Sequence, residues 1–308
     1  MKKKRWQTLW VAVRWAAVIA TTAIIVRVAF RHLDELSSFR FDISIYWLLP
    51  AALATMVANI LLPLGWRYLI IAYGPEIKKS TAIKLWCLAQ TGRYLPTGVM
   101  AVVTRISLAL KLSIPKSVTA ASIVVETLFL LAWAALICAL FIPTTTVTVE
   151  LKWLLGSVAL AGLLTLPRTM SGIGAKLTKT NPLKGDLATR LNMHRASALF
   201  GASIFARALG TITMAFTFLD VSYGDIDLLI GASYAGILIG MVGITPAGIG
   251  VRESVVVAIL IAPLGIGDAT AFAILSRAWE FGAEIIFLGL ASWWEHKVTK
   301  SSNERRQT

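Results

Sequence analysis

The sequence is divided into apolar runs of roughly 20 residues or more, separated by short charged segments. A bilayer core about 30 Å thick is crossed by about 20 helical residues, so runs of this length predict membrane-spanning helices. The composition agrees, because 57% of the 308 residues are apolar and only 15% are charged, against about 25% charged in soluble domains. We therefore expect an all-α polytopic membrane protein that forms a single transmembrane domain over residues 1–308.

Six of the runs are expected to be full membrane spans. They cover residues 9–30, 46–73, 117–142, 151–167, 196–219 and 269–294. The first begins after Met-Lys-Lys-Lys-Arg but exceeds the apolar core of a signal peptide, about 7–15 residues, so we expect an uncleaved span. Residues 81–110 and 228–263 are also apolar, but Pro, Gly and charged residues interrupt both near the middle.

Lys and Arg are concentrated on one side of this arrangement. If the N-terminus is cytoplasmic and each interrupted stretch enters and leaves the membrane on one side, the inner segments hold 19 basic residues and the outer segments three. Basic residues accumulate in cytoplasmic loops, so we expect a multi-pass protein of the plasma (cell) membrane with both termini cytoplasmic. Its cytoplasmic parts include a basic loop at 168–195 and a tail at 295–308, so the net charge of +14 indicates orientation rather than nucleic-acid binding.

The two interrupted stretches share a Pro-x-Gly motif. The first reads GRYLPTGV from residue 92 and the second GITPAGIG from residue 243, so that Pro96 and Pro246 lie 150 positions apart. The order span, span, hairpin, span then occurs twice with opposite orientation. This predicts an inverted repeat with halves at about 9–150 and 151–294.

Each motif is expected to break its helix. The breaking residues are Gly92, Pro96, Gly98, Pro246, Gly248 and Gly250. Proline suits the first turn of a helix, where no hydrogen-bond donor is lost, and glycine tolerates unusual dihedral angles. We therefore expect two oppositely oriented re-entrant helical hairpins whose half-helix N-termini form an anion site near the midplane. The alternative is that these residues only kink ordinary spans.

Charged residues inside the apolar segments are the candidates for substrate binding. They are Arg93, Arg105, Glu126, Arg252, Glu253, Arg277 and Glu280. Arg207 lies in the middle of a predicted span and could belong to the same set. Each costs about 2.5–3.5 kcal/mol at a helix centre on insertion scales, so such residues pair, face an interior or contact substrate. Arginine forks suit phosphate, and the glutamates would balance charge or accept a coupling proton. The alternative is a purely structural set of ion pairs.

Catalytic and metal-binding patterns are not recognisable in the sequence. Cys87 and Cys138 lie inside apolar runs, and His32, His194 and His296 lack ligand spacing. No Ser, Cys and His constellation suggests a nucleophile. We therefore expect no enzyme activity, no cofactor and no metal. The pair Gly236 and Gly240 instead favours close helix packing.

The motifs resemble those of a known family. GRYLP at residues 92–96 followed by Arg105, and TPAGIGVRE at residues 245–253, are similar to the flippase-like transmembrane region of the lysylphosphatidylglycerol synthase (multiple peptide resistance factor) family. Glu126 resembles the acidic residue of that family's Glu-Arg pair, although Thr127 stands where the family has Arg.

The resemblance covers most of the chain and implies opposed re-entrant helices and translocation of lipids with charged or phosphate heads. Full-length synthases add a soluble aminoacyltransferase domain, so a stand-alone member without it is expected. The leading hypothesis is flippase-like movement of membrane lipids with anionic or phosphate headgroups. The alternatives are a transporter or channel for a small anion, and a non-catalytic membrane partner of a glycosyl- or aminoacyltransferase that binds through residues 168–195.

Overall fold

The computed structural model describes residues 44–90, 100–178, 186–242, 248 and 250–307, and all regular elements in these segments are helical. The helices are α3 (Ile45–Tyr73), α4 (Lys79–Gln90), α5 (Met100–Leu110), α6 (Lys116–Phe141), α7 (Val149–Thr178), α8 (Asp186–Phe218), the 3-10 turn η2 (Tyr223–Asp225), α9 (Ile226–Val242) and α10 (Val251–Gln307). The all-α fold class is therefore confirmed.

Six of the described helices contain segments long and apolar enough to cross a membrane. Five of them, α3, α6, α7, α8 and α10, cover the spans predicted at 46–73, 117–142, 151–167, 196–219 and 269–294, except for Ile142 and Leu219, which directly follow α6 and α8. The sixth segment, Tyr223–Met241, covers most of α9 and begins the second interrupted stretch. The span predicted at 9–30 lies outside the described residues.

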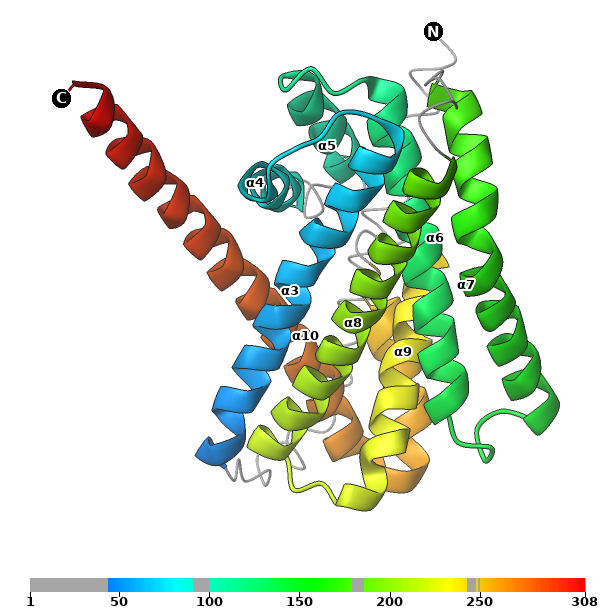
Figure 1. The fold of residues 1–308 in the computed structure, drawn as a ribbon. Helices are drawn as coiled ribbons and strands as arrows, with labels where there is room; N and C mark the ends of the chain where they lie inside the picture. The colour runs from blue at the N-terminus through cyan, green and yellow to red at the C-terminus, as the bar shows by residue number, and fades with distance from the viewer. Residues whose placement is uncertain (1–43, 91–99, 179–185, 243–247, 249, 308) are drawn as a thin grey trace, which may run out of the picture.

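The centre of the bundle is the pair α3 and α8, which make the most extensive contact in the protein. Figure 1 shows the two helices running side by side, with α6 and α7 on one flank. Small residues allow the close approach: a Cβ built on Gly210 would lie 2.5 Å from Thr55 Oγ1, and one on Gly65 would lie 2.7 Å from the Phe200 ring. Trp66, Phe129 and Phe200 are among the largest buried side chains of the core in which this pair lies.

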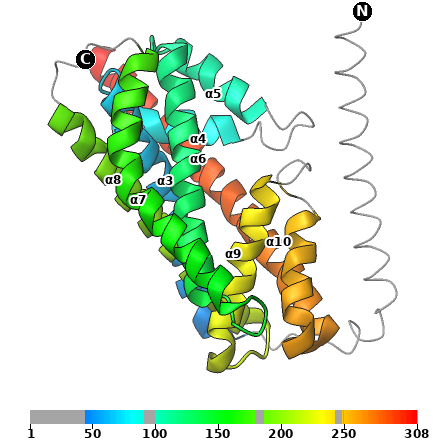
Figure 2. The same cartoon turned by 90° about the vertical axis from the view of Figure 1, so that its right-hand side faces the viewer.

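The helix labelled α10 consists of two arms joined at Gly265, whose φ of 81° and ψ of 165° are not helical. The first arm lies against α9, and the second runs back past α3 (Figure 1, Figure 2). Pro263 precedes the joint and contributes to the break, because a proline ring clashes with the preceding turn of a helix.

The helices α4 and α5 are the shortest α-helices described, with 12 and 11 residues. At about 1.5 Å per residue neither exceeds roughly 18 Å, which is shorter than a bilayer core of about 30 Å. Both lie at the end of the bundle where α3 ends and α6 begins (Figure 1). The residues between them, which include Gly92, Arg93, Pro96 and Gly98, lie outside the described part, and so does Pro246.

The segment predicted as a basic loop at 168–195 contains the ends of two helices. The helix α7 continues to Thr178, and α8 begins at Asp186. The tail at 295–308 includes the last residues of α10, which ends at Gln307. A span predicted from hydropathy ends where the apolar run ends, whereas a helix can continue past it; the start of α8 contains Leu, Ala and Arg, which favour a helix.

Candidate functional site

An ion pair between Arg105 on α5 and Glu126 on α6 forms the first charged site. Arg105 donates to Glu126 Oε2, and both residues are about 5–6% exposed. Trp86 Nε1 on α4 donates to the other carboxylate oxygen at 3.2 Å. The guanidinium carbon also lies 5.5 Å and 5.6 Å from the ring centroids of Trp66 and Trp86. These two predicted candidates therefore form an ion pair with each other, and two indole rings lie beside it.

Thr127, which follows Glu126, bonds within its own helix. Its Oγ1 donates to the carbonyl of Ile123 at 2.9 Å. The resemblance noted above places an arginine at this position, and Thr127 cannot replace it because a hydroxyl carries no charge. The cation beside Glu126 comes instead from Arg105 on a different helix.

The second charged site, called here the arginine cluster, consists of Arg207, Arg252, Arg277, Glu253 and Glu280. Its core is a two-pronged fork between the arms of α10. Arg252 NH1 and NH2 on the first arm donate to Glu280 Oε2 and Oε1 on the second arm, at 2.7 Å and 2.9 Å. Such parallel bonds are stronger and more directional than a single contact.

Two further arginines share the Glu280 carboxylate. Arg207 NH1 on α8 lies 3.8 Å from Oε1, and Arg277 NH1 lies 3.9 Å from Oε2. Arg277 Nε also lies 3.6 Å from Glu253 Oε1. With three arginines against two glutamates, the cluster carries one positive charge in excess, and the Glu280 side chain is only 11% exposed.

Glycines fix the backbone around Arg252. A Cβ on Gly236 of α9 would lie 2.9 Å from the Arg252 carbonyl oxygen, and one on Gly240 would lie 3.4 Å from Arg252 Cβ. The close packing predicted for this pair is therefore confirmed, with α10 as the partner.

Gly248 and Gly250 have φ of 68° and 84°, which L side chains rarely adopt. The Gly250 N–H donates to Glu253 Oε2 at 2.5 Å. The Glu253 carboxylate therefore satisfies one backbone N–H group at the start of the first arm of α10.

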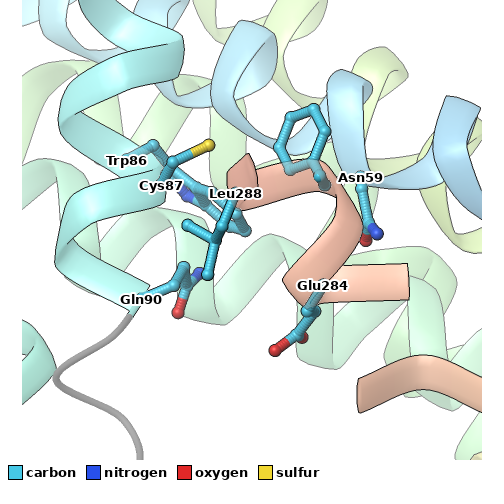
Figure 3. A pocket seen from close by; sticks show the side chains of 7 residues that line it. Asn59, Trp86, Cys87, Gln90, Glu284 and Leu288 are labelled. Atoms are coloured by element: carbon cyan, nitrogen blue, oxygen red, sulfur yellow. The ribbon is translucent and has the colours of Figure 1, made fainter. Parts of the chain in front are cut away.

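A small open cleft lies between α3, α4 and α10 (Figure 3). Its polar lining comes from Asn59, Gln90 and Glu284, with Trp86 beside them. Asn59 Oδ1 accepts from Arg207 NH2 at 2.9 Å. The cleft therefore borders both charged sites, through Trp86 on one side and Asn59 on the other.

Six of the seven predicted binding residues thus fall into two groups. Arg105 and Glu126 form the first, and the other four join Arg207 in the arginine cluster; Arg93 lies outside the described residues. The prediction omitted Asn59, Trp66 and Trp86. An asparagine within an apolar run was the available signal for the first, whereas a tryptophan in a membrane protein is too common to single out.

Comparison with known proteins gives one family. The model of the lysylphosphatidylglycerol synthase TM region matches residues 9–287, which is nearly the whole chain. No curated protein matches the sequence. The family match agrees with the helical architecture and with the motifs around Arg105 and Arg252. The chain therefore belongs to the lysylphosphatidylglycerol synthase TM region family and is a multi-pass membrane protein.

Proposed function

We propose that this protein is a lipid translocator without enzyme activity, which moves a phosphate-bearing or charged-headgroup lipid between leaflets. The observation that carries the proposal is the arginine cluster. A buried guanidinium that is bound by two parallel hydrogen bonds to a carboxylate can exchange that partner for a phosphate of similar geometry. The excess positive charge of the cluster favours this exchange, because an arriving phosphate is attracted to it.

The movement follows from the position of Glu280. While Arg252 binds Glu280, the two arms of α10 are held together. A headgroup phosphate that binds Arg252 releases Glu280 to Arg207 and Arg277, which already lie within 4 Å. The lipid headgroup then replaces a protein carboxylate inside the bundle, and the charge it brings is never exposed alone to hydrocarbon.

The helical hairpins belong to the same proposal. The pair α4 and α5 and the pair of α9 with the first arm of α10 are the two re-entrant hairpins of an inverted repeat, which enter from opposite ends of the bundle. Their positions in Figure 1 and the short lengths of α4 and α5 support this arrangement. The distribution of Lys and Arg supports cytoplasmic termini in the plasma membrane. Membrane lipids are the expected partners.

A reconstitution assay tests the proposal. Purified protein is placed in phosphatidylcholine vesicles with a trace of acyl-labelled phosphatidylglycerol, and the label that reaches the outer leaflet is quenched by an impermeant reductant. We expect wild-type protein to accelerate exchange, and Arg252→Ala to lower the protein-dependent rate by at least about tenfold, since a charged hydrogen bond contributes about 1.5–3 kcal/mol.

The matched control is Arg168→Ala, because Arg168 is an exposed arginine on α7. It should leave the exchange rate unchanged. Equal rates for wild type and Arg252→Ala, at matched yield and melting temperature, would refute the role of the cluster. Flux of inorganic phosphate or chloride without lipid exchange would instead assign the protein to the small-anion transporters.

A further inference from the structure

Two arginines of the central helix pair share one tyrosine ring. The guanidinium carbons of Arg67 on α3 and Arg195 on α8 lie 5.6 Å and 5.8 Å from the centroid of the Tyr68 ring. The distance between the two carbons is therefore at most the sum of these values, about 11.4 Å. Two like charges this close repel each other, and the face of one aromatic ring offsets only part of that repulsion. The arrangement therefore favours an anion beside the ring.

No carboxylate of the described residues neutralises this pair. Neither Arg67 nor Arg195 forms an ion pair with a described residue, whereas the four arginines of the two charged sites all do. Arg67 Nε donates to the Ile77 carbonyl oxygen at 2.7 Å, which fixes the guanidinium, and its two terminal amino groups make no hydrogen bond within the described part. Arg67 is half-buried and Arg195 is exposed. The pair therefore presents a fixed fork of N–H donors that is open to the surface, with a second cation beside it.

The position of Arg67 along α3 corresponds to the depth of lipid headgroups. The helix has 29 residues, about 43 Å at 1.5 Å per residue, which matches the roughly 40–45 Å of a bilayer with its headgroups. Arg67 precedes the last residue, Tyr73, by about 9 Å along the axis, so it lies where the headgroup layer meets the hydrocarbon. Tyrosine is enriched at the same level of membrane proteins. A lipid phosphate therefore lies at the height of this pair.

The surrounding segments add positive charge. Figure 1 shows α3 ending and α8 beginning at the same end of the bundle, where α4 and α6 also begin. The residues that the sequence places around these ends include more bases than acids: Lys78, Lys79, Lys111, Lys116, Arg168 and Arg190 against Glu76 and Asp186. Such an excess attracts anionic lipids to the nearby bilayer surface.

We infer that Arg67, Tyr68 and Arg195 form a surface site for the phosphate of an anionic phospholipid in the adjacent leaflet. Both guanidinium groups donate to its unesterified oxygens, which form charge-assisted hydrogen bonds with such forks. The site is distinct from the arginine cluster, because Arg207 of that cluster lies twelve residues further along α8, about 18 Å away. It binds a resident lipid whether or not the protein also moves lipids between leaflets.

Native mass spectrometry tests the site by counting the lipids bound to each protein molecule. Purified protein in a neutral detergent is titrated with phosphatidylglycerol or with phosphatidylcholine of the same acyl chains. We expect wild type to bind phosphatidylglycerol more tightly. Arg195→Ala should weaken the binding of one phosphatidylglycerol by about fivefold, the effect of one arginine near an anionic bilayer surface, and should leave phosphatidylcholine binding unchanged. The matched control is Arg168→Ala, an exposed arginine of α7 at the same end of the bundle, which should keep the wild-type affinity.

A double variant tests whether the two arginines bind the same phosphate. If they do, Arg67→Gln combined with Arg195→Ala should weaken binding by less than the product of the two single losses, because each single change already breaks the shared contact. Losses that multiply would overturn the shared site. Equal losses for Arg195→Ala and Arg168→Ala would overturn it too, since general surface charge would then explain the binding. Displacement of phosphatidylglycerol by an equal concentration of inorganic phosphate would assign the site to the free anion and overturn the lipid assignment.

Discussion

Replacing Glu280 by Gln tests whether the arginine cluster is a binding site or only a structural ion pair. The change keeps the size of the side chain and one acceptor oxygen, but it removes the charge that faces Arg252, Arg207 and Arg277. The cluster then keeps three guanidinium groups but one carboxylate, that of Glu253, which lies 3.6 Å from Arg277 Nε. Both hypotheses predict that the variant is less stable than wild type. They differ in which lipids should restore its stability.

The size of the loss follows from the burial of the fork. Breaking a buried ion pair by removing one partner costs about 3–5 kcal/mol, and the oxygen that Gln retains places Glu280→Gln near about 3 kcal/mol. At about 2 °C per kcal/mol for a large domain, this corresponds to a melting temperature lower by about 6 °C. Glu150→Gln, at an exposed position in the first turn of α7, is the matched control and should change neither quantity.

A lipid phosphate should replace the missing charge. A ligand present at about 100 times its Kd stabilises the native state by about 2.7 kcal/mol, which is close to the expected loss. We therefore expect thermal unfolding of purified Glu280→Gln to return to the wild-type temperature in micelles that contain phosphatidylglycerol, but not in micelles with phosphatidylcholine alone. The melting temperature of wild type should rise less in phosphatidylglycerol, because Glu280 competes with the lipid for Arg252.

Two results would refute this reasoning. If Glu280→Gln is as stable as wild type, the fork contributes nothing that a neutral amide cannot supply. If the variant is destabilised but anionic and zwitterionic lipids restore it equally, the cluster is a structural element and does not recognise phosphate.

Three further predictions concern other parts of the bundle. Gly236→Ala should destabilise the protein by about 1–3 kcal/mol through overpacking against α10 and slow lipid exchange, whereas Gly172→Ala, whose Cβ meets no described atom within 4 Å, should not destabilise it. Arg105→Lys keeps the charge but loses the guanidinium contacts with the Trp66 and Trp86 rings, so thermal unfolding should report a loss of about 1–2 kcal/mol, and an unchanged melting temperature would contradict a role for these contacts. Single cysteines at Glu76 and Lys111, before α4 and after α5, should react with an impermeant maleimide from the same side of the membrane; labelling from opposite sides would rule out a hairpin there.

Much of the architecture could be predicted from hydropathy because each long helix carries its own apolar signal. The helices α3 and α6 begin and end within a few residues of their apolar runs, and α8 ends within one residue of its run although it begins ten residues earlier. The length of α7 could not be predicted in this way, since its last turns leave the apolar run and contain Ser171, Gly172 and Gly174, which favour a helix only weakly. The cost of a charge in hydrocarbon singled out Glu126 and Glu280 as residues that need partners, but it did not say which arginines would pair with them.

Contacts between distant helices were beyond such reasoning. Asn59 and Arg207 are 148 positions apart, and only the packing of α3 on α8 brings them together. Trp66 looks like any aromatic residue of an apolar run, and its position beside Arg105 depends on where α5 crosses α3 and α6. Residue type indicated which side chains need partners, but the choice of partner depends on tertiary structure.

The joint at Gly265 has a kinetic consequence for the fork. Arg252 and Glu280 are only 28 positions apart, and the intervening chain is already folded into two helical arms, so little loop entropy opposes their contact. The carboxylate is therefore present at a high effective concentration, which for short tethers reaches the millimolar range. Under the proposed function, this nearby carboxylate returns to Arg252 whenever a lipid phosphate dissociates, so the lipid would occupy the cluster only briefly.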